Sequence, residues 1–425
     1  MVAIESQVSS LCTRGPITPA TPTRGAVEGL IQNALYQHKK LIRADIGMLQ
    51  EPITDYARAA LQTAVQEIVV AGYKPTEGLA AFREEIARFT TERFGVEIDP
   101  SWVVVGMGGS ECFSLVLKAL LRQGDSVATP DPHYANFDII AAEQGIQWVP
   151  IPTSPEYNYH PDLEVAENLT RTDNSIKAIY QCSPNNPTGT VLTRDEIRRT
   201  YELGKVALWD SVYSAFNYSD SPSSALEVLK DMDEAEREEA LRRSVFFDSM
   251  SKLAGLADLR IGWAIIPDNT LRAEVIKHAS ARGSVCGINQ RASEMVLRKM
   301  RENDFEILNE QKALYRKKRD LVHEALCRMQ EKRLLHVQSS PPDGGIYEMV
   351  EFDWTAFDFL KWSLESLKEA VTFVPITTDA GSFYTDSKQG IRRARLCFGL
   401  PIDQIPEAME LLENQLIKYK ESLSD

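Results

Sequence analysis

Seven short apolar runs separated by amphipathic stretches constrain the fold of this 425-residue chain more than any other feature. Runs of this length are typical of buried strands, and they alternate with stretches that have the pattern of helices. Such alternation requires crossover connections, which produce a mainly parallel sheet covered on both faces. We therefore expect an α/β fold with a three-layer domain. Its strands are predicted at residues 103–106, 126–129, 146–151, 177–182, 205–210, 244–249 and 260–266.

The two ends of the chain have a different character. The first 25 residues are rich in Ser, Thr and Pro and predict an arm, and helices are expected at 26–40, 55–71 and 79–94. From about residue 300 the pattern changes to a long charged helix (303–332), short strand-like segments and a terminal helix (403–421), as in a second, α+β domain. We divide the chain into an N-terminal arm and helix (1–45), a large domain (46–295) and a small C-terminal domain (296–425).

Composition argues against several functions. A formal net charge of −14 does not favour binding to nucleic acid or to an anionic membrane. No apolar run approaches the ~20 residues of a membrane span, and the N-terminus lacks the apolar core of a secretory signal. The six cysteines include no CxxC pair and the six histidines no HExxH spacing. We expect free, mostly buried thiols, no metal site and a cytoplasmic protein.

Lys252 carries the strongest chemical signal in the sequence. It follows a predicted apolar strand, in a segment from Ser249 to Leu256 that holds no other charge. A desolvated lysine has a lowered pKa and is a competent nucleophile toward an aldehyde. The hydroxyls of Ser249 and Ser251 and the guanidinium of Arg260 are donors suited to a phosphate group.

Polar residues follow two more of the predicted strands, where ligands bind in parallel sheets. Asp210 ends one strand, where it is either a helix N-cap or the partner of a protonated pyridine nitrogen. Tyr213 follows three residues later and is able to reach the phenolic oxygen of such a ring. Asn186 belongs to the segment SPNNPTG (183–189). This segment is either only a tight polar turn, or a turn from which the Asn186 amide donates a hydrogen bond to a cofactor or substrate oxygen.

A glycine-rich segment and an aromatic residue complete the pattern. GMGGSECF (106–113) follows a predicted strand and opens a helix, so its free N–H groups and the positive helix end favour a phosphate. Tyr134, in DPHYANF, offers a ring for stacking. Together, the motifs predict a reactive lysine, an acid for a ring nitrogen and a cradle for a phosphate.

The motifs SxSK with a following arginine, NNPTG and DxxY resemble, in kind and order, those of the fold-type I, class I/II aminotransferases, which use pyridoxal 5′-phosphate (PLP). The resemblance runs from about Asp45 to the C-terminus. It implies that Lys252 forms the internal aldimine, that Asp210 pairs with the pyridine nitrogen, and that Tyr213 and Asn186 contact the ring hydroxyl. It also implies stacking of Tyr134 on the ring. The residues implied to hold the phosphate are Gly109, Ser110, Ser249 and Arg260.

The same resemblance implies substrate contacts and an oligomer. Arg395, in RRARLCFG, matches the arginine that grips the substrate α-carboxylate with a bidentate fork, with Arg392 and Arg393 as nearby alternatives. Gly47 matches the glycine beside the substrate. Tyr73, in GYKPTEG, matches the tyrosine that reaches the phosphate of the neighbouring subunit, which implies a homodimer with shared active sites.

The chain departs from the family pattern in two regions that line the substrate pocket in the family. Ala380-Gly381 replaces the usual Pro-Gly before Phe383, and Arg282 and Cys286 stand where small polar residues are common. Arg282 is either a contact for an acidic substrate side chain or keto acid, or a surface or dimer-contact residue. These departures leave the substrate open.

The parts together predict transamination between an α-amino acid and a 2-oxo acid, with Lys252 as the general base and the cofactor ring as the electron sink. A PLP-dependent lyase or cyclase acting at the β- or γ-carbon is the alternative, because the same intermediate serves both reactions. A PLP-binding regulator is not favoured, because residues 1–45 contain no basic recognition helix.

Overall fold

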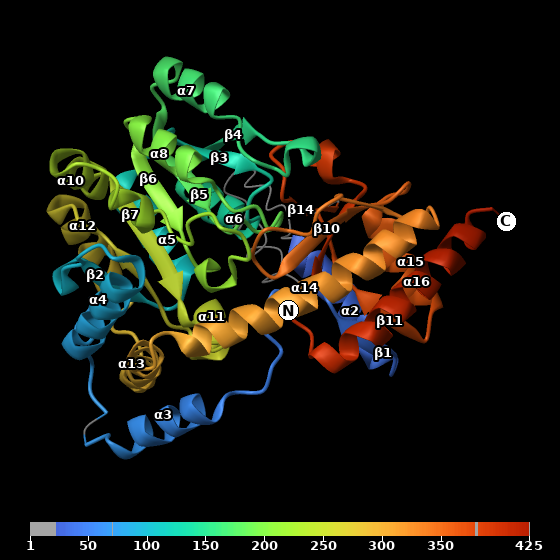
Figure 1. Ribbon diagram of the computed structural model, residues 1–425, viewed down its shortest axis with the longest axis horizontal. Helices are drawn as coiled ribbons and strands as arrows, with labels where there is room; N and C mark the ends of the chain where they lie inside the picture. Colours follow the sequence, from blue (N-terminus) through green and yellow to red (C-terminus); the bar gives the residue numbers. More distant parts are fainter. Residues whose placement is uncertain (1–22, 70, 379–380, 425) are drawn as a thin grey trace, which may run out of the picture.

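The computed structural model describes residues 23–69, 71–378 and 381–424. Its largest feature is a seven-stranded sheet, in the left half of Figure 1. The strands are β2 (Val103–Gly106), β3 (Ser126–Asp131), β4 (Gln147–Pro152), β5 (Ile176–Cys182), β6 (Val206–Asp210), β7 (Ser244–Ser249) and β8 (Gly262–Ile265). Their order is β2-β8-β7-β6-β5-β3-β4, and only β8 runs antiparallel to its neighbours. The predicted α/β fold with a mostly parallel sheet is confirmed.

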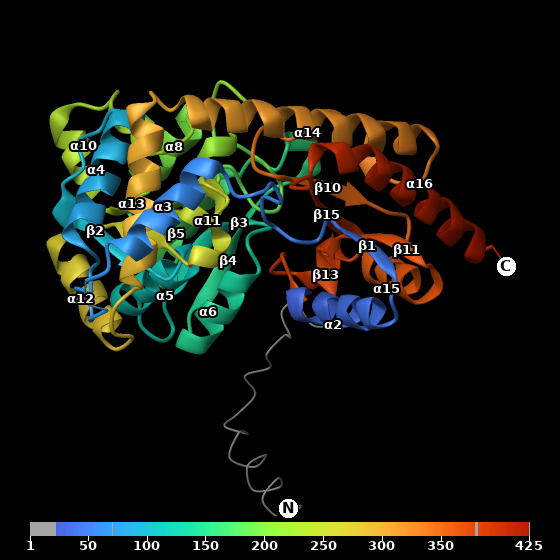
Figure 2. The ribbon, with the colours of Figure 1, turned by 90° about the horizontal axis from the view of Figure 1, so that it is seen from below.

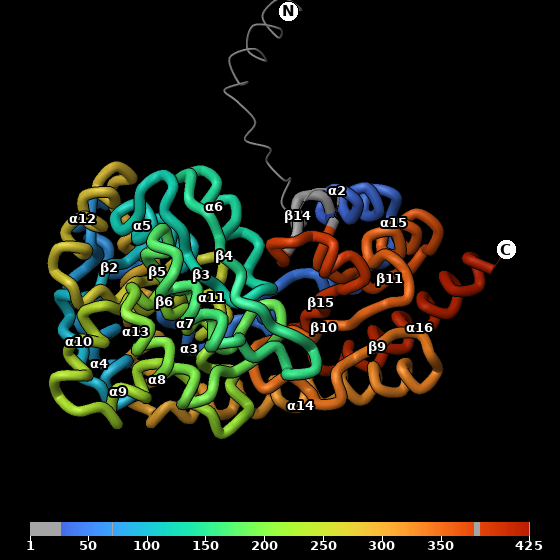
Figure 3. Tube along the Cα trace, turned by 90° about the horizontal axis from the view of Figure 1, so that it is seen from above, coloured from blue at the N-terminus to red at the C-terminus, as the bar shows by residue number. Residues whose placement is uncertain are grey.

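Helices cover both faces of this sheet, which explains the lack of alternation in its strands. All six residues of β7 are buried, as they must be between two layers. Figures 2 and 3 show helices α5 (Gly109–Leu120), α6 (Asn136–Gln144) and α12 (Asn269–Ser280) on one side. On the other side lie α4 (Ala80–Phe94), α8 (Arg194–Glu202) and α10 (Glu234–Arg242). The remaining helices of this part are α3 (Asp55–Gln66), α7 (Leu163–Thr172), α9 (Leu226–Leu229), α11 (Met250–Leu253) and α13 (Gly287–Glu302).

The C-terminal part of the chain builds a smaller α+β unit. The strands β9 (His336–Val337), β10 (Tyr347–Glu351), β12 (Val374–Pro375) and β15 (Arg393–Cys397) form an antiparallel sheet in the order β12-β15-β10-β9. A second pair is β13 (Thr377–Thr378) with β14 (Gly381–Ser382). Helix α14 (Glu306–Glu331) runs from the large sheet to this unit along one side of the molecule (Figure 2). Helices α15 (Ala356–Ser366) and α16 (Ile405–Ser422) complete it.

The N-terminal segment packs on this smaller unit rather than on the large sheet. Helix α2 (Thr23–Tyr36) contacts α15, and β1 (Lys40–Arg43) pairs in parallel with β11 (Glu369–Thr372). The helix predicted over 26–40 is therefore wrong at its end, because the strand that follows it is stabilised by a partner more than 300 residues away. The predicted arm lies, for residues 1–22, outside the described residues. The domain boundaries at residues 45 and 295 stay predictions.

Within the described ranges, no helix is both long enough and apolar enough to cross a membrane.

Candidate active site

A cavity of about 860 Å³ lies between the large sheet and the smaller unit, and both parts line it. Of the predicted site residues, only Tyr73 is absent from its wall. The predicted residues that line the cavity are Gly47, Gly109, Ser110, Tyr134, Asn186, Asp210, Tyr213, Ser249, Lys252, Arg260 and Arg395.

The parallel strands explain why residues so distant in sequence meet here. Asp210 is the last residue of β6, and Ser249 is the last residue of β7. Asn186 follows β5, the neighbour of β6 on its other side. Because the carboxyl ends of parallel strands share one edge, all three side chains reach the same cavity. Lys252 joins them from α11, the short helix that begins directly after β7.

Asp210 is a buried carboxylate held in a fixed orientation. Its Oδ2 accepts a hydrogen bond from the Tyr180 hydroxyl at 2.8 Å, and its Oδ1 accepts one from the Val212 N–H at 3.2 Å. The next helical turn begins only at Ser214, so Asp210 is not its N-cap. Burial raises the pKa of Asp210 to about 6, although Tyr180 and the Lys252 ammonium act in the opposite direction. A cation bound beside the Asp210 carboxylate would therefore offset the unfavourable burial of its charge.

The N-terminus of α5 forms an anion-binding cradle at one end of the cavity. Gly108 has a φ of +91°, which suits glycine, and α5 begins at Gly109. Gly262 of β8 lies against this turn so closely that a Cβ there would be 2.5 Å from the backbone of Gly108 and Gly109. The Arg260 guanidinium reaches the same place and donates to the Met107 carbonyl at 3.3 Å. Free N–H groups, a positive helix end and a guanidinium together suit a phosphate.

Arg395, in β15 of the smaller unit, is a second group suited to an anion. It is only 6% exposed, with its guanidinium 4.2 Å from the ring centre of Tyr347 and 5.4 Å from that of Phe383. Its Nη1 donates to Asn186 Oδ1 at 2.9 Å and its Nη2 to the Asp45 carbonyl at 3.2 Å. Its Nε is buried and has no hydrogen-bond partner among the described residues. A buried guanidinium is costly unless it is paired, and a carboxylate in the cavity that Arg395 lines would pair with it.

The two alternatives to Arg395 are placed differently. Arg392 is exposed, and Arg393 donates to the Glu351 carboxylate at 3.0 Å and contacts the Tyr384 hydroxyl. Neither lines the cavity.

Lys252 lines the same cavity as Arg395 and the start of α5. Its Nζ donates to the Gly47 carbonyl and lies 5.9 Å from the ring centre of Tyr213. Gly47 has no room for a side chain, because a Cβ there would collide with the Tyr347 hydroxyl. The amine is thus held next to the segment that also contacts Arg395.

Comparison with known proteins agrees with this geometry. The model of the family described as "Aminotransferase class I and II" matches residues 46–412. The chain belongs to this family. A putative aminotransferase of Bacillus subtilis is 26% identical to it over 353 residues, covering 81% of this chain and 84% of the relative. An aspartate aminotransferase of Pyrococcus horikoshii is 25% identical over 352 residues, covering 81% and 83%. The crystal structure of an aspartate aminotransferase of Thermotoga maritima, 22% identical, matches with a TM-score of 0.79 over 93% of this chain and 96% of that chain.

This class I/II aminotransferase is accordingly an enzyme that uses PLP, as members of the family do. The residues present fit that cofactor. The α5 cradle and Arg260 suit its phosphate, the buried Asp210 suits a protonated ring nitrogen, and Lys252 suits its aldehyde. The Arg395 guanidinium, which lines the same cavity, suits a second anion, as an amino-acid substrate provides.

Two of the residues that depart from the family pattern do not line the cavity of this aminotransferase. The Arg282 guanidinium pairs with the Glu111 carboxylate and donates to the Val105 carbonyl at 2.6 Å. Its side chain is only 10% exposed and does not line the cavity of its own chain, so a substrate contact within this chain and an exposed surface position are both corrected, while the dimer contact stays a prediction. Its charge neutralises a carboxylate of the first turn of α5 instead. Cys286 is exposed, Phe383 lines the cavity, and Ala380 lies outside the described residues.

Sequence reasoning missed two tyrosines of the site. Tyr180 orients Asp210, and Tyr347 contacts Tyr213 and Arg395. Both lie within segments that the sequence marks as strands, where an aromatic residue is ordinarily part of the core. Nothing local distinguishes a core tyrosine from one whose hydroxyl reaches the site.

Proposed function

We propose that this cavity exchanges an amino group between an α-amino acid and a 2-oxo acid, with Lys252, Asp210 and Arg395 acting on the reacting groups. One observation carries the proposal. The buried Arg395 lines the same cavity as Lys252 and Asp210, and so does the start of α5, whose N–H groups suit the cofactor phosphate. One cavity thus offers two groups suited to anions together with an amine, as a PLP-bound amino acid requires.

The cofactor would be held from several sides at once. Asp210 would pair with the ring nitrogen, Tyr213 and Asn186 would contact the ring hydroxyl, and Tyr134 would stack on the ring. The phosphate would be held by Gly109, Ser110, Ser249 and Arg260. When bound, the cofactor supplies an aldehyde that condenses with amines and a cationic ring that withdraws electrons from the substrate α-carbon.

The residues of the chain then have separate tasks. Arg395 binds the substrate carboxylate and so fixes the direction of the α-carbon–hydrogen bond. The Lys252 amine, held beside the Gly47 carbonyl, takes the proton from the α-carbon as general base. Asp210, kept in place by Tyr180 and the Val212 N–H, keeps a proton on the ring nitrogen. The aromatic rings of Tyr347 and Phe383 shield Arg395 from water, which strengthens its hold on an anion.

We further propose that the active enzyme is a homodimer with shared sites. Tyr73 is 96% exposed and lies outside the cavity of its own chain, so a role at a phosphate requires a second copy. Two apolar residues shortly before it in the sequence are also exposed, Val69 at 94% and Val65 at 56%. Several exposed apolar side chains in one short stretch of chain favour an interface.

A product assay tests the proposed reaction. The enzyme is incubated with PLP and a panel of amino acids, with and without 2-oxoglutarate, and the 2-oxo acids formed are quantified. We expect one keto acid per acceptor consumed and no turnover without an acceptor. The Lys252→Ala variant should form no keto acid, with or without the acceptor. Sustained turnover without any 2-oxo acid would contradict transamination and favour the lyase or cyclase alternative.

A further inference from the structure

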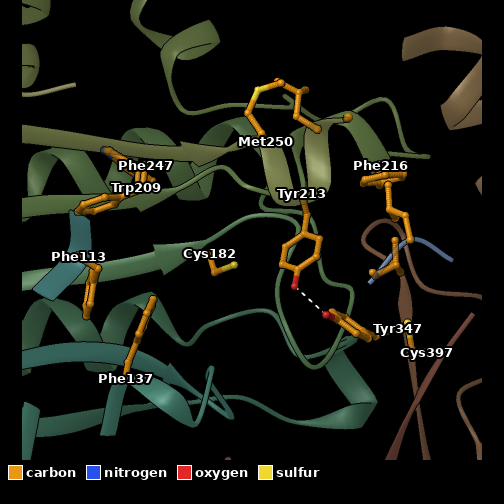
Figure 4. Packing of buried hydrophobic residues seen from close by; sticks show 14 of the residues in the cluster. Phe113, Phe137, Cys182, Trp209, Tyr213, Phe216, Phe247, Met250, Tyr347 and Cys397 are labelled. Carbon is orange, nitrogen blue, oxygen red and sulfur yellow. Dashed lines mark hydrogen bonds between the residues drawn. The ribbon is translucent and has the colours of Figure 1, made fainter. Parts of the chain in front are cut away.

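Four side chains in the cavity form a closed ring of contacts. The Tyr213 and Tyr347 hydroxyls are 2.8 Å apart, as the dashed line in Figure 4 shows. Asn186 Nδ2 donates to the Tyr213 hydroxyl at 3.3 Å, and Asn186 Oδ1 accepts from Arg395 at 2.9 Å. The Arg395 guanidinium in turn lies 4.2 Å from the Tyr347 ring centre. The ring of contacts therefore connects the residues proposed for the cofactor phenol with the residue proposed for the substrate carboxylate.

The ring of Tyr347 shields Arg395, but its hydroxyl has not been given a role. Tyr347 is the first residue of β10 and is 1% exposed. Its ring packs edge-on against that of Tyr213, with 5.5 Å between the centroids and an angle of 73°. Its hydroxyl fills the space where a side chain at Gly47 would be. The packing therefore holds the hydroxyl in one place.

The hydrogen bonds determine which way the protons point when a phenolic oxygen binds beside Tyr213. A tyrosine hydroxyl donates one hydrogen bond and accepts others. Burial raises the pKa of both Tyr213 and Tyr347 well above the ordinary value, so both hydroxyls keep their protons at neutral pH. If Tyr213 donates its proton to the phenolic oxygen, Tyr347 must donate to Tyr213. Hydrogen bonds in such a chain polarise and strengthen one another.

We propose that Tyr347 is a positioning residue for transamination. Its hydroxyl strengthens the hydrogen bond from Tyr213 to the phenolic oxygen of PLP, and its ring supports Arg395. This inference rests on the proposed function, because it assumes that Tyr213 contacts that oxygen. The inference assigns one task to the Tyr347 hydroxyl and another to its ring. Two substitutions separate these tasks.

Tyr347→Phe removes the hydroxyl and keeps the ring. The measurement is a pH titration of the visible absorption of the bound cofactor. A proton donated to the phenolic oxygen stabilises its anion and so favours the form of the cofactor that has lost a proton. We therefore expect the pH midpoint to rise in Tyr347→Phe, by roughly half to one pH unit for a hydrogen bond of ordinary strength. The kcat should fall while KM changes little, whereas Tyr347→Leu should also raise KM because Arg395 loses the ring beneath it.

Tyr315→Phe is the matched control. Tyr315 is also 1% exposed, but it does not line the cavity and its hydroxyl has no hydrogen-bond partner. Its removal should leave the pH midpoint unchanged. The double variant Tyr213→Phe/Tyr347→Phe should show the same midpoint as Tyr213→Phe alone, because Tyr347 acts through Tyr213.

Two results would overturn the inference: an unshifted midpoint in Tyr347→Phe, or additive shifts in the double variant. Failure of the proposed function would look different. In that case the unsubstituted protein would still show pH-dependent cofactor absorption, but it would turn over amino acids without a 2-oxo acid as acceptor.

Discussion

At the scale of the residue, the burial of the charged Asp210 carboxylate lowers the stability of the fold. Asp210 is buried, the Lys252 ammonium offsets only part of the cost of burial, and its pKa rises from 3.8 to about 6. A carboxylate in this state destabilises the folded chain and is relieved when a protonated ring nitrogen binds. The site is thus built to favour its ligand rather than its own stability.

This cost predicts a pH-dependent stability of the cofactor-free protein. Below about pH 4 the carboxyl is protonated in the folded and the unfolded chain, and no cost arises. Between about pH 4 and 6 the unfolded chain loses the proton first, so the free energy of unfolding falls as the pH rises. Above that range the full cost, about 3 kcal/mol, is present. Asp210→Asn should remove this loss and raise the melting temperature at pH 8, while weakening PLP binding.

Thermal unfolding of both cofactor-free proteins from pH 5 to 8 measures this difference. Asparagine has one acceptor oxygen, so the substitution removes the charge together with one of the two hydrogen bonds that Asp210 accepts, and the pH dependence of the difference reports on the charge. An equal change in stability with pH in parent and variant would show that the Asp210 charge is compensated in the folded chain.

Arg395 gives a second prediction at this scale. Arg395→Lys keeps the charge but loses the fork and the unpaired Nε, so KM for the amino acid should rise by on the order of 100-fold. Steady-state kinetics measure it, and Arg392→Ala, which removes an exposed arginine of the same segment, is the control. A large effect of Arg392→Ala with an unaffected Arg395→Lys would reassign the carboxylate site.

At the scale of the element, the position of α5 depends on one glycine in a neighbouring strand. Gly262 of β8 leaves room for the turn at Gly108 and Gly109, where the phosphate cradle begins. Backbone atoms occupy the space that a Cβ would need, and backbone does not move aside as a flexible side chain does. The cradle is therefore set by the packing of a helix on a strand.

Gly262→Ala should displace the first turn of α5 and weaken PLP binding at least tenfold. The measurement is equilibrium titration of the cofactor-free protein with PLP. Gly29→Ala is the control, because nothing lies within 4 Å of a Cβ at that position of α2. It should bind PLP normally, with a stability equal to or above that of the parent. Normal affinity in Gly262→Ala would mean that the phosphate does not rest on this turn.

At the scale of the whole molecule, the cavity lies between two units and one predicted residue does not reach it. Tyr73 is exposed, so its function is predicted to depend on a second chain. Lys252→Ala and Tyr73→Ala should each be poorly active alone. When the two are unfolded and refolded together, hybrid dimers should regain activity, because one of their two sites combines an intact Lys252 with an intact Tyr73.

The amount of activity regained distinguishes active sites shared between two subunits from active sites built within one subunit. Random pairing makes about half of the dimers hybrids, each with one complete site. Activity no higher than the average of the separate variants would contradict sharing between subunits. Analytical ultracentrifugation of the parent protein tests the dimer independently.

Local sequence determined much of this protein. The seven strands are short apolar runs because burial on both faces removes alternation, and Thr193 with Glu196, three residues later, forms a capping box at the start of α8. Lys252, Asp210 and Asn186 were identifiable because each follows a strand at the edge where parallel sheets bind ligands. These features depend on neighbours along the chain, so a single sequence displays them.

Only the tertiary structure decided the rest. The strand β1 is stabilised by its pairing with β11. The antiparallel orientation of β8 in the large sheet depends on the order of the strands, which no local sequence pattern predicts. Arg282 pairs with Glu111 rather than with a substrate, and Tyr347 reaches Tyr213, through contacts between residues more than 130 positions apart. A charge or a hydroxyl acquires its role from the partner beside it, and the packing of the two units supplies that partner.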